Sequence, residues 1–282
     1  MLYYGEMAEL LFGTAGIPIS TQPQTTIAGI KRVAELRLGC MELEFVQGVY
    51  LSETDARLVA ETAESHGVKL SAHAPYFLNF NSHELRKVRT SQGILRKAAR
   101  IASICGAENV VFHTGFYLGD PPQKVYQTVK KYLAEVVEQL KEETNRLCLR
   151  PELSGKPSQF GTVEEILSLS TELDRVAPGI DFAHWHAITR GVNSYSGFTS
   201  VLGQIQEKLG RVALDNMHLH ISGIAYGGKG EIRHLSLKGS DFKYLELLRA
   251  LKDFGVKGMA ICESPNREED ALLLKESYQS LS

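Results

Sequence analysis

Short runs rich in Val, Ile, Leu and Phe alternate along the chain with longer segments in which apolar residues recur at helical spacing. The apolar runs predict eight strands, at residues 10–14, 40–45, 69–73, 109–113, 147–152, 180–184, 216–222 and 258–263. The periodic segments predict one helix after each strand, at residues 26–37, 53–65, 85–104, 122–143, 163–176, 197–208, 241–254 and 268–280. This alternation is typical of repeated βα units that build a parallel sheet.

Local signals support these boundaries. Ser52 and Thr162 each precede acidic residues at a predicted helix start, and Gly67, Gly106 and Gly255 follow predicted helix ends. Eight consecutive βα pairs within 282 residues indicate one domain, residues 1–282, with an α/β fold of the (β/α)8 TIM-barrel type. An open doubly wound sheet stays as the alternative, because counting elements does not distinguish the two folds.

Six successive predicted strands end in or near histidine or carboxylate side chains. In a TIM barrel the C-terminal ends of the strands form one rim, which faces the active site. The residues at this rim are His73, His113, Glu152, Asp181, His184, His218 and Glu263, and His234 follows in the long loop after the seventh strand. Crowded carboxylates and imidazoles must pair or bind a cation to offset their desolvation. This mixture of nitrogen and oxygen ligands therefore predicts a site for zinc, manganese or iron.

The other histidines receive different interpretations. His66 lies at a predicted helix C-terminus and His83 near a helix start, where both are expected at the surface. His186 and His220 each lie two residues past a candidate ligand and share its face if the segment is extended. We expect them either as outer partners of the ligands or as substrate contacts.

Composition narrows the functional classes. The chain has 31 Lys and Arg against 33 Asp and Glu, a formal charge of −2, which gives no support to DNA binding by bulk charge alone. The four cysteines are far apart in apolar surroundings, so free buried thiols in a reducing compartment are expected. The sequence has neither a signal-peptide pattern at residues 1–9 nor a run of about 18 apolar residues. We therefore expect a cytoplasmic protein without a membrane partner.

Other motif classes do not match. The sequence contains no GxGxxG, GxxxxGK[ST], HExxH or GxSxG motif, which leaves a nucleotide or serine-hydrolase interpretation without support. The predicted helix at residues 85–104 is basic, and Arg89, Arg96 and Arg100 fall on one of its faces. We interpret this face as solvated, with phosphate contact as the alternative.

The motifs around the rim, taken in chain order, resemble the endonuclease IV family. They are HAPYFLN from His73, FHTG around His113, PELSGKPSQFGT around Glu152, DFAHWHA from Asp181, MHLHISG around His218, RHLSLKG from Arg233 and CESP around Glu263. This family is a metal-dependent branch of the xylose isomerase-like TIM barrels and cleaves DNA at apurinic or apyrimidinic sites. The resemblance spans residues 10–265. It implies hydrolysis of the phosphodiester 5′ to an abasic site in double-stranded DNA by a monomeric repair enzyme with two or three zinc ions, or manganese.

The resemblance also implies a ligand set. The first ion would be held by His73, His113 and Glu152; the second by Glu152, Asp181, His218 and Glu263; and the third by His184 and His234. Glu152, Asp181 and Glu263 are the carboxylates that we expect to be essential for catalysis.

The third ligand group departs from the family pattern. The family has Asp two residues before the histidine that matches His234, and this chain has Ile232 there. Glu231 can substitute only if the loop shifts; otherwise His186, His220 or water must complete the third site.

The resemblance implies DNA contacts as well. The family inserts side chains into DNA after its first histidine, and the matching positions are Tyr76 and Phe77, for which stacking on DNA and core packing are equal alternatives. The loop at residues 47–51 lacks the basic and amide side chains of the family.

Two other functions compete with the endonuclease. One is a sugar isomerase or epimerase with Glu152 and Glu263 as proton-transfer bases and a single ion between Asp181 and His218. The other is a non-catalytic protein that binds damaged DNA, a hypothesis motivated by Ile232.

Overall fold

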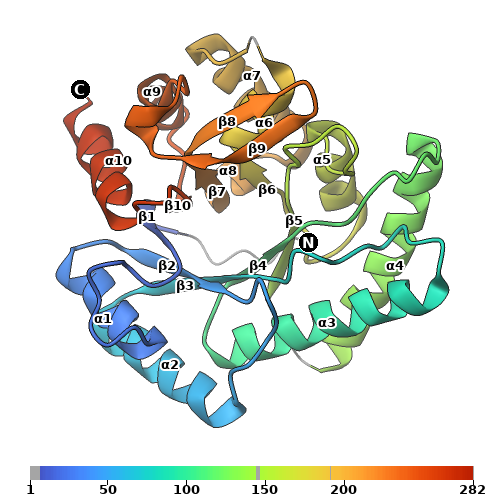
Figure 1. Cartoon of the computed structure of the whole chain (residues 1–282), viewed down its shortest axis with the longest axis horizontal. Coiled ribbons are helices and arrows are strands. Elements are labelled where there is room, and N and C mark those ends of the chain that lie inside the picture. The colour runs from blue at the N-terminus through green and yellow to red at the C-terminus, as the bar shows by residue number, and fades with distance from the viewer. Residues whose placement is uncertain (1–6, 144–146, 191, 282) are drawn as a thin grey trace.

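Eight parallel strands form the centre of the computed structural model, which describes residues 7–143, 147–190 and 192–281. The strands are β1 (Leu10–Ala15), β2 (Cys40–Glu44), β3 (Lys69–His73), β4 (Asn109–Phe112), β5 (Cys148–Pro151), β6 (Gly179–Asp181), β7 (Met217–Ile221) and β10 (Gly258–Cys262). They are hydrogen-bonded in the order β5-β4-β3-β2-β1-β10-β7-β6. Parallel bridges from Leu149 to Val176 and from Glu152 to Gly179 join the two ends of this order. The sheet thus closes into the predicted barrel (Figure 1).

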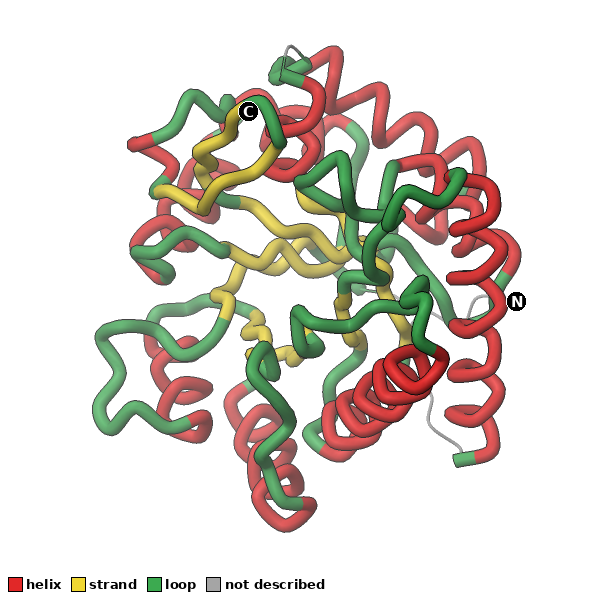
Figure 2. The backbone as a smooth tube through the Cα atoms, turned by 45° about the vertical axis from the view of Figure 1, so that its right-hand side comes forward, coloured by secondary structure: helices red, strands yellow, loops and turns green. Residues whose placement is uncertain are grey.

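Helices surround the strands on the outside, as the red and yellow segments of Figure 2 show. They are α1 (Thr26–Glu35), α2 (Glu53–His66), α3 (Leu85–Ile104), α4 (Pro122–Glu142), α5 (Val163–Glu172), α6 (Phe182–Thr189), α7 (Tyr195–Leu209), α8 (Arg211–Leu214), α9 (Tyr244–Asp253), α10 (Glu268–Ser280) and the short 3-10 turn η1 (Leu237–Gly239). Helix α5 ends before the predicted residue 176, because Val176 is buried and joins the barrel through its bridge to Leu149.

Burial on two sides explains why the strands are continuous apolar runs rather than alternating ones. Every residue of β4, β5, β7 and β10 is buried, since one face of each strand lies in the barrel interior and the other lies under the helices. All four cysteines are buried and free, as the sequence predicted; they are Cys40, Cys105, Cys148 and Cys262.

The segment after β6 differs from the prediction of an extended run to residue 184. The strand ends at Asp181 and helix α6 begins at once, because the Asp181 side chain accepts a hydrogen bond of 2.7 Å from the backbone N–H of His184. An aspartate that caps a helix in this way lies close to the residue three positions later. Asp181 and His184 are therefore neighbours in the rim.

The segment after β7 was predicted as a loop and contains a hairpin. Its strands are β8 (Gly223–Gly227) and β9 (Gly230–Leu235), which pair antiparallel and pack against α6. The hairpin turn places Gly230 at φ +88°, a conformation that glycine adopts without strain. Figure 1 shows this hairpin in orange beside α6.

A buried arginine inside the barrel forms hydrogen bonds to residues at the starts of three other strands. Arg150 of β5 donates through Nε to Asn109 Oδ1 (2.6 Å), through Nη1 to the carbonyl of Pro178 (3.0 Å), and through Nη2 to Asn216. These acceptors precede or begin three other strands, β4, β6 and β7. One guanidinium thus satisfies polar groups from several strands at once.

Replacement of Arg150 by methionine is expected to lower the free energy of unfolding by about 2–4 kcal/mol, because several buried acceptors lose their donor. Chemical denaturation measures the change. Methionine at Arg57, whose side chain is 67% exposed, is the matched control and should shift stability by no more than about 0.5 kcal/mol. Equal stability of the two variants would contradict a structural role for Arg150.

Candidate metal centre

The predicted rim residues converge on one cavity at the C-terminal ends of the strands. The cavity has a volume of about 730 Å³, and His113, Glu152, His184, Glu231, His234 and Glu263 line it. His73 and Asp181 are the last residues of β3 and β6, and Glu152 and Glu263 directly follow β5 and β10. Closing the barrel therefore brings together side chains that are distant in sequence.

Glu152 lies at the centre of this arrangement. Its Oε2 is 3.2 Å from both His73 Nε2 and His113 Nε2, and its Oε1 is 2.8 Å from His220 Nδ1. His73 Nδ1 lies 2.7 Å from the carbonyl oxygen of Ala74, to which it can only donate. In a neutral ring this would leave Nε2, which lies 3.2 Å from Glu152 Oε2, as the His73 nitrogen able to bind a metal. His73, His113 and Glu152 are thus arranged as one candidate ligand group.

A second group shares Glu152. The ligand atoms of Glu152, Asp181, His220 and Glu263 lie within 4.8 Å of one another. Asp181 Oδ2 and Glu263 Oε2 are buried, and neither has a hydrogen-bond partner within the described part of the chain. Buried carboxylate oxygens that lack a donor are costly. The group therefore fits a divalent cation, which would satisfy both oxygens.

In the structure His220, rather than the expected His218, lies with this second group of candidate ligands. His218 lies deeper in the barrel, and its Nε2 is 3.0 Å from Glu42 Oε2. Residues two apart in a strand point to the same side but lie one layer apart along it, so only the residue nearer the C-terminal end of β7 reaches the rim. The MHLHISG motif contains both histidines, and the nearness of His220 to the strand end was the signal that distinguishes them.

A third group lies at the edge of the cavity. Ligand atoms of Asp181, His184 and His234 lie within 4.8 Å of one another. His184 Nδ1 lies 3.0 Å from the carbonyl oxygen of Leu153, which fixes this nitrogen as a donor and leaves Nε2 facing Glu231 Oε2 at 3.5 Å. Glu231 Oε1 is 3.7 Å from His234 Nε2. Glu231 thus supplies a carboxylate to this group.

A register shift in the hairpin explains how Glu231 reaches the position. Ala225 pairs with Arg233 and Tyr226 with Glu231, so the pairing skips Ile232. Residues three apart in a regular strand face opposite sides, and one extra residue returns them to the same side. Glu231 and His234 therefore both face the cavity, whereas Ile232 is 66% exposed. The sequence indicated that Glu231 could take the place of the family's Asp only if this loop were shifted, and the hairpin has such a register shift.

Glycine makes room for this carboxylate. A Cβ atom at Gly155 would lie 2.9 Å from Glu231 Cβ and 2.8 Å from His184 Cδ2. The backbone N–H of Glu231 also donates to the carbonyl of Gly155 at 2.8 Å. The loop after β5 and the hairpin are thus in direct backbone contact at the third group.

Burial and the facing groups shift the pKa values of the site in opposite directions. Burial opposes ionisation of Glu152, but the imidazoles of His113 and His220 outweigh it and hold the pKa of this carboxyl well below its usual range. Burial raises the pKa of Glu263 well above its usual range, and Glu152 and Asp181 add to the effect. Burial lowers the pKa of His113 to about 3, which favours its neutral, ligating form.

The cavity is also lined by residues that were not predicted from the sequence. The polar and charged ones among them are Glu44, Lys156, Gln159, Ser264 and Arg267. Glu44 and Arg267 line a neighbouring cavity of about 380 Å³ as well. Lys156 follows Glu152 in its motif, and Glu44 alternates with Glu42 among the apolar residues of β2, so both had a visible sequence signal.

The remaining candidates divide between the rim and the surface. Tyr76 lines the cavity with its ring 4.9 Å from that of His73, and Tyr76 and Phe77 are 50% and 59% exposed. His186 lies away from the ligand groups and contacts Asp241 at 3.0 Å. Its expected role at the metal centre is therefore not supported.

The basic helix α3 has the solvated role that we favoured from the sequence. Its arginines form ion pairs with neighbouring helices, in which Arg89 pairs with Glu135, Arg96 with Glu143 at 2.7 Å, and Arg100 with Glu53 at 2.5 Å. Acidic partners thus neutralise this face.

The chain belongs to the xylose isomerase-like TIM barrel family, whose sequence pattern matches residues 30–282. An uncharacterized protein of Methanocaldococcus jannaschii is 43% identical over 273 residues, which are 96% of this chain and 98% of that protein. A probable endonuclease 4 of Mycoplasma genitalium is 25% identical over 202 residues, 70% of this chain and 67% of that protein. The resemblance to endonuclease IV is thus confirmed as a distant relationship.

Two solved structures are similar across nearly the whole barrel. Endonuclease IV from Thermus thermophilus has a TM-score of 0.73 at 17% identity and covers 95% of this chain and 98% of its own. A D-tagatose 3-epimerase-like protein has a TM-score of 0.71 at 20% identity, with 94% and 96% covered. These similarities show the fold alone, because an endonuclease and an epimerase-like protein match this chain about equally well.

Within the described residues, no helix has the length and apolar character that crossing a membrane requires.

Proposed function

We propose that the protein is a metal-dependent apurinic/apyrimidinic endonuclease that hydrolyses the phosphodiester 5′ to an abasic site in double-stranded DNA. The observation that carries this proposal is the position of Glu152 between two ligand groups, with Oε2 facing His73 and His113 and Oε1 facing His220. A carboxylate with its two oxygens divided in this way is suited to bridge two divalent ions, as two-metal phosphodiesterases require.

The ligand groups fit zinc, with manganese as the alternative. The first group is His73, His113 and Glu152; the second is Glu152, Asp181, His220 and Glu263; and the third is Asp181, His184 and His234, with Glu231 facing both imidazoles. Divalent cations in such sites supply water activation near neutral pH and neutralise charge on a phosphoryl group.

Other side chains of the cavity would bind and orient the DNA. Lys156 and Arg267 line the cavity and can donate to phosphate oxygens. Tyr76, which lines the cavity, and Phe77, which follows it in the chain, are both about half-exposed and offer aromatic surfaces for stacking or wedging. An abasic nucleotide enters such a pocket at the lowest cost, because no base must be unstacked.

Incision of a duplex containing a tetrahydrofuran abasic analogue tests the proposal. Protein loaded with zinc is expected to cut 5′ to the analogue, and the same duplex with an ordinary nucleotide is the control. Metal analysis of the same sample establishes how many ions are bound. Full metal occupancy without incision would reject the endonuclease activity.

A sugar isomerase or epimerase is the second candidate, and Glu44 favours it. Its Oε1 is buried and has no hydrogen-bond partner among the described residues, although the side chain lines both cavities. Burial, together with the charge of Glu42, raises the pKa of the Glu44 carboxyl to about 7. Such a group suits proton transfer or sugar hydroxyls better than it suits a phosphate.

Deuterium exchange separates the two candidates. An isomerase or epimerase abstracts a proton next to a carbonyl, so incubation with ketohexoses in D2O would place deuterium on carbon. The endonuclease proposal predicts no such incorporation with either zinc or manganese. The non-catalytic DNA-binding protein stays as the third hypothesis; the position of Glu231 beside His184 and His234 argues against it, because that carboxylate could stand in for the one missing at Ile232.

A further inference from the structure

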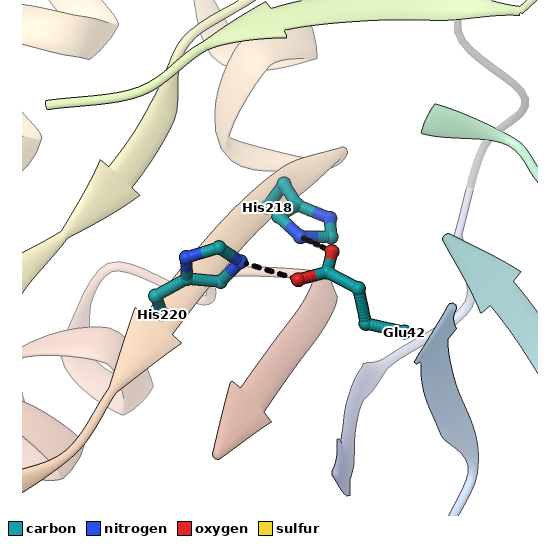
Figure 3. Close-up of side chains that lie close together, drawn as sticks. All are labelled: Glu42, His218 and His220. Atoms are coloured by element: carbon teal, nitrogen blue, oxygen red, sulfur yellow. Dashed lines mark hydrogen bonds and ion pairs between the residues drawn. The ribbon is translucent and has the colours of Figure 1, made fainter. Parts of the chain in front are cut away.

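A second polar cluster lies beneath the candidate metal centre, inside the barrel. Its members are Glu42 of β2 and His218 and His220 of β7, and all three side chains are buried (Figure 3). Strands β1 and β10 separate β2 from β7 in the sheet. Glu42 therefore reaches β7 across the barrel interior.

Each oxygen of Glu42 faces a nitrogen of the cluster. Oε2 accepts a hydrogen bond of 2.9 Å from Ser71 Oγ and lies 3.0 Å from His218 Nε2. Oε1 lies 2.9 Å from His220 Nε2. Ser71 is the neighbour of Glu42 across the β2–β3 pair, so the carboxylate is held from its own side of the barrel as well as from β7.

These distances suit shared protons better than a further metal ion. Ligand atoms about 2.0–2.1 Å from a tetrahedral zinc lie about 3.3 Å apart. The gaps of 2.9 and 3.0 Å between Glu42 and the two imidazoles are shorter than that. His218 Nε2 is hydrogen-bonded to Oε2, whereas His220 Nε2 meets Oε1 in a close charged contact that is not aligned as a hydrogen bond.

His220 has a carboxylate at each of its two ring nitrogens. Its Nε2 faces Glu42, whereas its Nδ1 faces Glu152 Oε1 at 2.8 Å and Glu263 Oε2 at 3.5 Å. A neutral imidazole carries one N–H, and its other nitrogen is the lone pair that binds a metal. If Nε2 carries the proton towards Glu42, Nδ1 offers its lone pair to the second ligand group.

We propose that Glu42 is the positioning residue of the metal centre: its charge, 2.9 Å from His220 Nε2, keeps the proton of a neutral ring on that nitrogen when a cation is bound, which leaves Nδ1 for the group of Glu152, Asp181 and Glu263. This inference deepens the proposed function and rests on its metal centre. The negative charge of Glu42 also strengthens His220 as a ligand, since a carboxylate behind an imidazole raises its basicity. His218 and Ser71 keep the carboxylate in place.

Glu42→Gln tests the proposal, because glutamine keeps the shape and removes the charge. Zinc affinity is measured by competition with a chromophoric chelator, and one ion is expected to bind 10–100-fold more weakly. Ser71→Ala is the matched control, since it removes another donor to the same carboxylate without contacting His220; its affinity should change less than about threefold. In the zinc-loaded wild type, long-range ¹H–¹⁵N spectra of histidine should show the His220 proton on Nε2.

Several results would overturn the proposal. Unchanged zinc affinity in Glu42→Gln would do so, as would a His220 ring whose Nε2 lacks a proton. The second measurement uses the wild type and decides the matter even if the variant does not fold. A count of bound ions that falls by one with the other affinities unchanged would make Glu42 a ligand instead.

The proposed function can fail separately. Wild-type protein that binds zinc with the expected His220 tautomer but leaves abasic DNA intact would reject the endonuclease and retain the role of Glu42. Wild-type protein that binds no divalent ion would reject both.

Discussion

Glu152→Gln is expected to lower the rate of abasic-site incision by roughly 10⁴-fold, a loss of about 5 kcal/mol of transition-state stabilisation. Glu152 contacts His73 and His113 through one oxygen and His220 through the other. Glutamine has one carbonyl oxygen and no charge, so it cannot bridge the first two ligand groups. Single-turnover cleavage measures the rate, and metal analysis should show the loss of at least one ion.

Glu165→Gln is the matched control for this variant. Glu165 lies on the same connection after β5, where it forms the capping box of α5 with Thr162, outside the cavity. It is expected to cost no more than about 1 kcal/mol of stability and to leave incision unchanged. Activity retained by Glu152→Gln, with wild-type metal content, would show that the reaction takes place elsewhere.

The strands were predictable because barrel strands are buried on both faces. The runs at residues 109–113 and 258–263 are largely apolar for this reason, and the structure places β4 and β10 there, each ending one residue earlier, at Phe112 and Cys262. The prediction that the strand continues past Asp181 was wrong. The sequence FAHWHA is as apolar as a strand, but in the structure it forms helix α6. The cap from Asp181 to the N–H of His184 decides its conformation, and hydrophobic periodicity does not detect it.

The site was predictable in kind but not in every residue. Strand ends identified His73, Glu152 and Glu263, because chain order alone places them at one rim. The choice between His218 and His220 depends on depth along β7, which a motif alone does not give. Glu42 was missed because its partners lie across the barrel, and contacts of that kind have no sequence signature. Its alternation with Glu44 in an apolar strand was the available hint.

The sequence suggested that the third ligand group lacks a carboxylate, whereas the structure places Glu231 beside that group. Counting back from His234 gives Ile232, which suggests a missing ligand. The hairpin skips Ile232 in its pairing and turns Glu231 towards His184. One inserted residue therefore changes the spacing of the motif without changing which chemical groups meet in the cavity.

Glu231→Gln is expected to reduce the number of bound zinc ions from three to two and to slow incision by about 10²–10³-fold, the effect of losing roughly 3–4 kcal/mol of charge stabilisation. The Glu231 carboxylate lies 3.5 Å from His184 Nε2 and 3.7 Å from His234 Nε2, so its charge would hold a cation between the two imidazoles. Ile232→Asp is the informative control, because this side chain is exposed and faces away from the cavity. It should change neither the zinc count nor the rate, and adding it to Glu231→Gln should restore neither. Recovery of the third ion by Asp at position 232 would mean that the hairpin adopts the regular register in solution, and the bulge would then not be what completes the site.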